Sequence, residues 1–283
     1  MDLQRRRQLL VFDRYLARIF SVFGEAAVLK GGLVLELRLE NARTTKDVDL
    51  GLSGDSAKIL PRLQEAGRLD LGDYMSFKVQ SDLHHPVIQA AGLPYEGRRY
   101  RAEASFAGKI YGAPFGIDVA LAESLMGNSE VVKGSPFLSF AGFAPTRFRV
   151  YPVETHVAEK LHAYTLPRQR LNSRVKDFPD LALLASVRPI EAAALRATID
   201  RTFEKRATHH VPSVMPQPPT EWEPTYARLA ESDALAWKTL DELTDRVRRF
   251  LDPVLDDPSG SWDPQDWSWS GTGYSQLSRS TRR

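Results

Sequence analysis

Two aspartates separated by one valine, Asp47-Val48-Asp49, constrain the fold of this chain more than any other feature of its sequence. They begin a stretch in which Val48, Leu50 and Leu52 alternate with acidic or small residues. Alternate side chains of a strand point to one face, so the stretch predicts a strand that buries its apolar residues and projects both carboxylates together. Carboxylates this close repel each other unless a cation neutralises them, and Mg²⁺ binds carboxylates together with substrate phosphates. The pattern favours a Mg-nucleotide site, although a solvated strand edge would have the same pattern.

Two glycines, Gly31 and Gly32, follow a short apolar run at 26–29 that predicts a buried strand. Glycines at a strand-to-helix turn let backbone N–H groups approach a phosphate, and the N-terminus of the next helix favours negative charge. Residues 33–40 are locally ambiguous, because leucines alternate as in a strand while Glu36 and Glu40 lie four apart as on a helix. We interpret them as a helix, since a strand–turn–helix–strand order brings the glycines beside the aspartates.

The whole chain has 283 residues, 42% of them hydrophobic, which is enough for one large or two small domains with a core. No apolar run is long enough to span a membrane. Cysteine is absent, so neither disulfides nor thiolate metal sites can form, which fits a cytoplasmic location. The net charge of +2 does not by itself demand a nucleic-acid partner.

The first half of the chain has the texture of a sheet with flanking helices. Residues 3–23 and 56–66 predict amphipathic helices. Residues 100–111 and 116–121 alternate like strands, and the turn chemistry at 112–115 joins them into a predicted hairpin.

Asp118 lies in the second strand of this hairpin, between apolar neighbours. An acidic side chain inside an apolar strand is costly unless it is paired or bound to a cation. Asp118 is therefore a candidate third metal ligand. An exposed strand end, or an ion pair with Lys109 or Lys133, would also explain it.

From residue 152 onward the pattern becomes helical, with runs at 155–164, 178–186, 190–205 and 227–251. After residue 256 the chain is rich in serine, glycine and tryptophan, which predicts little order. The sequence thus predicts an α/β (α+β) protein with a catalytic sheet domain at 1–150, a helical domain at 151–256 and a disordered tail at 257–283.

Three blocks of residues carry a resemblance to a known family. In chain order they are Lys30-Gly31-Gly32, then Arg43-x-Thr45-x-Asp47-x-Asp49, then Glu159-Lys160-Leu161-His162-Ala163-Tyr164 with Arg174-x-Lys176-Asp177-x-x-Asp180-Leu181. Together they resemble the AbiEii family, the nucleotidyltransferase-like toxins of type IV toxin–antitoxin and phage-defence pairs that include the mycobacterial MenT toxins. The resemblance covers residues 15 to 190 and implies a nucleotidyltransferase-like mixed sheet followed by a helical domain.

The resemblance also implies roles for individual residues. Mg²⁺ or Mn²⁺ would be held by Asp47 and Asp49, with Asp118 as the third ligand. Lys160 would contact phosphate and Asp177 would complete the site. The nucleoside triphosphate would be bound by Lys30, Gly31, Gly32 and Arg43.

Each of these roles has a plainer alternative. Lys160 follows Glu159 on a helix and could be a solvated surface lysine. Asp177 could form a local ion pair with Lys176 or Arg174, and Asp180 shares its helix face, so either aspartate could be the functional acid. The six histidines show no helical zinc spacing and are interpreted as structural or surface residues.

The activity that the resemblance implies is transfer of a nucleotidyl group from an NTP to the 3′ acceptor end of tRNA, which would block translation. A cognate antitoxin would be encoded nearby, and phosphorylation of Thr45 or Thr44 would inactivate the toxin. Basic residues suited to RNA occur at 98–101 and 168–176, where they could equally be solubilising charges. Two alternatives remain: transfer to a protein hydroxyl or small molecule, and a non-catalytic nucleotide-binding regulatory module.

Overall fold

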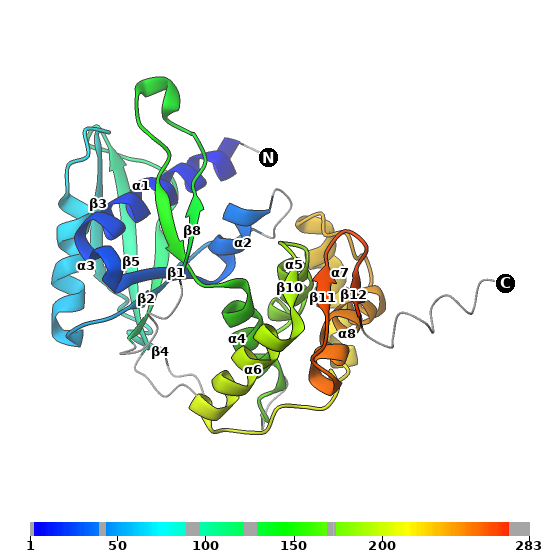
Figure 1. Ribbon diagram of the computed structural model, residues 1–283. Helices are drawn as coiled ribbons and strands as arrows, with labels where there is room; N and C mark the ends of the chain where they lie inside the picture. Colours follow the sequence, from blue (N-terminus) through cyan, green and yellow to red (C-terminus); the bar gives the residue numbers. More distant parts are fainter. Residues whose placement is uncertain are drawn as a thin grey trace. The chain divides into compact units, whose positions relative to one another are not determined.

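The computed structural model describes residues 3–39, 44–88, 97–121, 129–168, 172 and 174–271. They form two compact units: a sheet unit (the described residues of 3–38 and 44–151) and a helical unit (Leu39 and the described residues from Pro152 onward). The predicted mixed α/β class is confirmed: a mixed sheet with flanking helices comes first, and helices follow (Figure 1). Every helix within these described ranges is too short or too polar to cross a membrane.

The sheet unit is built on one mixed sheet. Its strands are β1 (Ala27–Lys30), β2 (Val48–Leu52), β3 (Met75–Ser81), β4 (Val87–Ile88), β5 (Gly97–Phe106), β6 (Lys109–Ile110), β7 (Phe115–Leu121), β8 (Glu130–Lys133) and β9 (Arg147–Val150). The spatial order is β3-β5-β7-β2-β1-β9-β8, and β4 and β6 both pair with β5. The β2–β7 and β1–β9 pairs are parallel, and the other pairs are antiparallel.

Helices α1 (Leu3–Phe23) and α3 (Ile59–Arg68) pack on each other and lie on one face of this sheet (Figure 1). The ring of Tyr15, on α1, lies 5.1 Å from that of Phe77 on β3 and 5.5 Å from that of Phe115 on β7. Because side chains alternate along a strand, the residues between these core positions point to the opposite face. That face carries the acidic residues singled out from the sequence.

The strand–turn–helix–strand order is confirmed, because α2 (Gly32–Arg38) lies between β1 and β2. The predicted hairpin exists as the antiparallel β5–β7 pair, but its predicted turn is wrong. Strand β5 ends at Phe106, and the chain turns at Ala107 and Gly108, with φ of 48° and 78°, into the short strand β6. Two successive residues with positive φ suit the tight turns of hairpins. In the sequence Ala-Gly, only the glycine is a residue type that favours positive φ.

The helical unit contains α4 (Val153–Thr165), α5 (Asp177–Ala185), α6 (Ala192–Arg206), α7 (Glu223–Ser232) and α8 (Leu240–Asp256). The run predicted at 227–251 is therefore two helices. Thr239 begins α8 with a capping box, since its side chain accepts from the N–H of Glu242 and Glu242 accepts from the N–H of Thr239. The Thr-x-x-Glu spacing is a helix-start signal visible in the sequence.

The tail predicted to be disordered from residue 257 is folded up to Gly271, which corrects the prediction. Strands β11 (Ser261–Asp263) and β12 (Ser268–Ser270) form a hairpin, and β11 also pairs with β10 (Ile190–Glu191). The indole N–H of Trp262 donates to Ala185 O, and that of Trp269 donates to Phe250 O. Burial of these two indoles stabilises the folded segment although most of its other residues are polar. Residues 272–283 lie outside the described part of the chain.

Candidate active site

The two aspartates lie where the alternation of β2 predicts. Val48 and Leu50 are buried in the core, whereas Asp49 is half-buried on the opposite face. Asp47 is exposed just before the strand begins, and its Oδ1 accepts a hydrogen bond from the backbone N–H of Gly116 at 3.2 Å. The two carboxylates therefore lie on the same side of the sheet.

Each aspartate packs against a glycine that has no room for a side chain. Gly31 joins β1 to α2 with a φ of +72°, and a Cβ on it would overlap the carboxylate of Asp49. A Cβ on Gly116, in β7, would lie 2.6 Å from Oδ1 of Asp47. The sequence suggested that Gly31 lets a phosphate approach; in the structure the carboxylate of Asp49 lies where a side chain at Gly31 would be.

The segment that leads into β2 is held by an ion pair that the sequence did not single out. Arg5, on α1, donates to Glu36, on α2, and its Nη1 donates to the carbonyl of Thr45 at 2.7 Å. Glu36 Oε1 accepts from the N–H of Thr45 at 2.6 Å. Both the N–H and the carbonyl group of Thr45 are thus hydrogen-bonded, two residues before Asp47.

Asp118 lies beside Asp49 and has an arginine as its partner. The two aspartates are in register on the parallel strands β2 and β7. Arg99, opposite Asp118 on β5, donates from Nε to Oδ1 and from Nη2 to Oδ2, both at 2.6 Å. These hydrogen bonds raise the pKa of Arg99 above its already high value. The sequence offered Lys109 or Lys133 as the partner of Asp118, and the structure corrects this to Arg99.

Charged residues consequently form a row across four strands, which we call the charged row. Lys30 on β1 is in register with Asp49 on β2, Asp49 with Asp118 on β7, and Asp118 with Arg99 on β5. The order of charges is positive, negative, negative, positive. Each carboxylate therefore has the other acid on one side and a basic residue on the other.

The carboxylates in and beside this row suit a hard divalent cation, which prefers oxygen ligands. Among the described residues, no group of three or more acidic, histidine or cysteine side chains is placed to hold a metal ion. Both oxygens of Asp118 accept from Arg99. Asp47 and Asp49 are the carboxylates on this face that could hold such an ion, which would take its remaining ligands from phosphate oxygens and water.

Lys160 is buried in the helical unit, contrary to the surface alternative. Its Nζ, on α4, donates to Oδ1 of Asp177 at 2.9 Å and to Oδ2 of Asp180 at 2.7 Å, both on α5. Asp180 is fully buried, whereas the side chain of Asp177 keeps 16% of its surface exposed and lies 3.4 Å from Arg174 Nη1. Of the two acids that the sequence could not separate, Asp177 is the one that solvent reaches.

The remaining predicted residues are scattered. Thr45 is buried and the neighbouring Thr44 is exposed. Arg43 lies outside the described residues.

The basic run on β5 is split between the two faces of the sheet. Arg99 and Arg101 share the face of the carboxylates, whereas Arg98 shares the face of the buried Tyr100. Of the second basic run, Arg168, Arg174 and Lys176 are described and belong to the helical unit.

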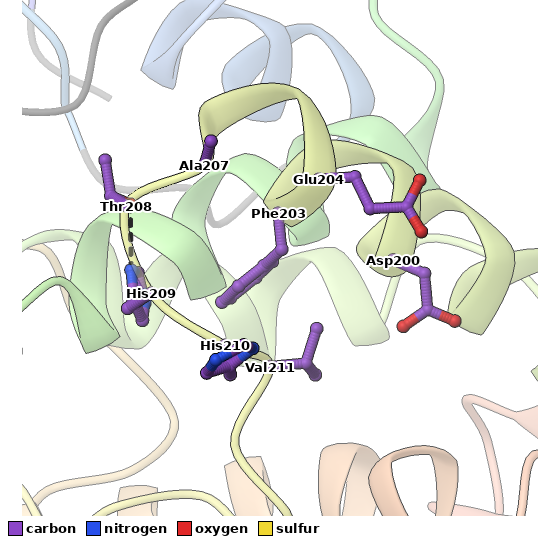
Figure 2. Close-up of a pocket in the computed structure, with 8 residues that line it drawn as sticks. All are labelled: Asp200, Phe203, Glu204, Ala207, Thr208, His209, His210 and Val211. Atoms are coloured by element: carbon purple, nitrogen blue, oxygen red, sulfur yellow. Dashed lines mark hydrogen bonds between the residues drawn. The ribbon is translucent and has the colours of Figure 1, made fainter.

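A cavity of about 490 Å³ in the helical unit lies at the end of α6 and contains none of the predicted site residues (Figure 2). Figure 2 shows Thr208 and His209 on its wall, joined by a hydrogen bond of 2.9 Å. Thr208 Oγ1 also lies 2.8 Å from Nε2 of the buried His162, whose ring is 4.8 Å from that of His209. Burial, with His209 and Arg206 nearby, lowers the pKa of His162 to about 4.

This low pKa predicts that the protein loses stability as the pH falls. An unfolded histidine takes up a proton near pH 6.5, whereas native His162 resists protonation down to about pH 4. The stabilisation is complete above pH 6.5 and is lost between 6.5 and 4, up to about 3 kcal/mol. Urea unfolding at pH 7.5 and pH 5 measures the part of this loss that falls between pH 6.5 and 5, about 2 kcal/mol. The variant His162→Gln should weaken this pH dependence of the unfolding free energy, whereas His84→Gln, at an exposed histidine, should not change it. If wild type and His162→Gln lose the same stability between the two pH values, His162 is not the group responsible.

A family model and solved structures match most of this chain. The family model described as nucleotidyl transferase AbiEii toxin, type IV TA system, matches residues 14–269. MenT4, a nucleotidyltransferase toxin from Mycobacterium tuberculosis H37Rv, superposes with a TM-score of 0.56 at 17% identity, covering 98% of this chain and 91% of that one. JHP933 from Helicobacter pylori has a TM-score of 0.45 at 12% identity, covering 99% and 96%. No curated protein matches in sequence.

Proposed function

Because this chain belongs to the AbiEii family of nucleotidyltransferase toxins, we propose that it transfers a nucleotidyl group from an NTP to the 3′ acceptor end of tRNA. In this reaction the terminal hydroxyl oxygen bonds to the α-phosphorus, and the bond to the leaving pyrophosphate breaks. The modified tRNA could no longer be charged, so translation would stop. A tRNA acceptor would place the reaction in the cytoplasm, and the type IV family implies a cognate antitoxin.

The observation that carries this proposal is the pair Asp47 and Asp49, each packed against a glycine on one face of the sheet. A bound Mg²⁺ or Mn²⁺ would neutralise charge on the attacking and leaving oxygens. Asp47 and Asp49 would hold that ion, and Lys30 with the Gly31-Gly32 turn would bind the triphosphate. Arg43 would also bind the triphosphate, a role that rests on the family resemblance alone.

The roles that we propose for Lys160 and Asp177, in the helical unit, rest on the family resemblance. Two carboxylates already orient the Lys160 ammonium, which is suited to phosphate as a compact charge. Asp177, whose side chain is 16% exposed, would hold Lys160 in place, and Asp180 would be its buried support. The basic residues Arg168, Arg174 and Lys176, on the same unit, could bind the phosphates of an RNA acceptor with strong salt dependence.

Phosphorylation near the aspartates is the proposed mode of inactivation. A phosphate adds about two negative charges at neutral pH, which would oppose nucleotide binding beside Asp47. Thr44 is exposed to a kinase, whereas Thr45 is 8% exposed and would require the Arg5–Glu36 pair to open first. Intact mass after co-expression with the antitoxin tests this, and an inhibited but unmodified toxin would exclude it.

Transfer from each of four α-³²P-labelled NTPs to purified total tRNA, with Mg²⁺, tests the proposed function. We expect label on tRNA for wild type and a loss of at least about a hundredfold for Asp49→Asn, because the ligand charge is removed. Asp70→Asn, at an exposed aspartate of the same unit, should keep full activity.

The other acceptor classes give different outcomes in the same assay. Label that depends on Asp49 but appears on protein or on a small molecule would show that this molecule, and not tRNA, is the acceptor. Nucleotide binding without any transfer would favour the regulatory module. Undiminished tRNA labelling by Asp49→Asn would exclude the proposed metal site.

A further inference from the structure

We propose that Arg99 is a positioning residue that serves as an exchangeable counter-ion of Asp118, holding this carboxylate until the metal and nucleotide bind and then turning to the triphosphate. The inference rests on the proposed function and deepens it. It gives Arg99 a role in metal binding and makes Asp118 a ligand that becomes available only after this exchange.

The first support is the position of Arg99 in the charged row. Asp49 and Asp118 are in register on adjacent parallel strands, so two acids face each other across neighbouring strands. Before a metal binds, their repulsion must be balanced by other charges. Arg99 binds both oxygens of Asp118 at 2.6 Å, so it satisfies the carboxylate that lies farther from Lys30 in the row.

The second support is that the pair is accessible enough to open. The side chains of Arg99 and Asp118 are 37% and 18% exposed. By contrast, the pair of Arg18 and Asp73 in the same unit is 0% and 1% exposed. Partly exposed ion pairs contribute little net stability because water replaces their contacts, whereas breaking a buried pair is costly. Of these two pairs, the Arg99–Asp118 pair is the one that can exchange partners at low cost.

The third support is the chemistry of the exchange itself. Arg99 and Asp118 point to the face that carries Asp47 and Asp49. A guanidinium binds phosphate oxygens with the same two-point geometry that it uses for a carboxylate. When Arg99 moves to a phosphate, Asp118 regains two free oxygens beside Asp49. Metal and nucleotide binding should therefore be coupled through Arg99.

Mn²⁺ binding, followed by electron paramagnetic resonance of the free ion, tests the inference without depending on turnover. Titrations are made on the full chain with and without an α,β-methylene NTP analogue. We expect Arg99→Gln to bind Mn²⁺ about fivefold or more tightly than wild type without nucleotide, since coupling energies of this kind correspond to such factors. The analogue should strengthen Mn²⁺ binding in wild type and much less in Arg99→Gln.

Arg101→Gln is the matched control, because Arg101 lies on the same strand and face and is in register with Gly116 instead of an acid. It removes the same charge from the same face without releasing Asp118, so it should change Mn²⁺ affinity much less than Arg99→Gln does. Arg99→Lys, which keeps the charge but not the two-point geometry, should fall between wild type and Arg99→Gln. In an Asp118→Asn background, Arg99→Gln should have no further effect. Melting temperatures show whether each variant is folded.

Equal Mn²⁺ affinities for Arg99→Gln and Arg101→Gln would overturn the inference. Arg99 and Asp118 would then form a permanent cross-strand ion pair. An undiminished effect of Arg99→Gln in the Asp118→Asn background would overturn it as well. If Arg99→Gln does not fold, Arg99→Lys decides: wild-type affinity and wild-type coupling in that variant would contradict the exchange. Failure of the proposed function looks different, because wild type itself would then bind no Mn²⁺, or Asp49→Asn would bind it equally well.

Discussion

Gly31→Ala should lower nucleotidyl transfer by about a hundredfold or more, because the new methyl group takes the place of the Asp49 carboxylate. Gly31 has a φ of +72°, and its Cβ would overlap Oδ2 of Asp49. The backbone cannot yield easily, since Lys30 and Asp49 are paired in the β1–β2 ladder. Asp49 must therefore turn away, and a displacement of about 1 Å in a reacting group can cost a hundredfold in rate.

Gly72→Ala separates this steric effect from backbone strain. Gly72 belongs to the same unit and has the same φ of +72°, but nothing lies within 4 Å of its Cβ position. Both variants should lose stability by about 1–2 kcal/mol, as an L-residue in the left-handed region does. Only Gly31→Ala should lose activity and Mn²⁺ affinity in the folded protein. Equal activity of the two variants would show that Gly31 does not position Asp49.

Asp73→Ala should destabilise the sheet unit by about 3–5 kcal/mol, the usual cost of leaving a buried charge without its partner. Asp73 lies just before β3 and accepts from Arg14 Nε and Arg18 Nη2, each at 2.6 Å. Both arginines are on α1, and Arg18 is fully buried. Removing Asp73 leaves the buried guanidinium of Arg18 without a counter-charge and leaves Arg14 with only Asp13, 3.7 Å away.

Urea unfolding at pH 7 measures this loss, with Asp70→Ala, at an exposed position three residues earlier, as the control. The pH dependence gives a second readout. Burial alone would raise the pKa of Asp73, but hydrogen bonds from Arg18 and Arg14 outweigh it and lower the pKa to about 2. The stabilisation is present above pH 3.8 and is lost as the pH falls through 2, about 2 kcal/mol in total. A similar stability for Asp73→Ala and Asp70→Ala would show that the arginines find other partners.

Local patterns were sufficient for the framework of the sheet unit. The alternation at 48–52 predicted both the strand and the face of Asp49, because a strand has a strict two-residue period. The glycines predicted the turn between β1 and α2, and the order of elements resolved the ambiguous leucines into a helix. The three motif blocks indicated the family that the comparison of residues 14–269 confirms. All of these follow from short-range geometry or from residue identity.

The partner of Asp118 could not be found in this way. A turn at 112–115 would bring Lys109 opposite Asp118, but the chain turns at 107–108, and the register brings Arg99 there instead. A change of register moves every cross-strand partner, so a small error in the turn misplaces an ion pair.

Long-range packing likewise decided the environment of the helical residues. The sequence left open that Lys160 is a surface lysine, whereas in the structure Asp177 and Asp180 of α5 bury it. The tail was predicted to be disordered, but its indoles are buried against α5 and α8. Residue identity and period therefore established which side chains carry charge and which face of a strand they take. Their partners, burial and pKa values depend on segments distant in the chain, because these properties arise from the contacts that packing creates.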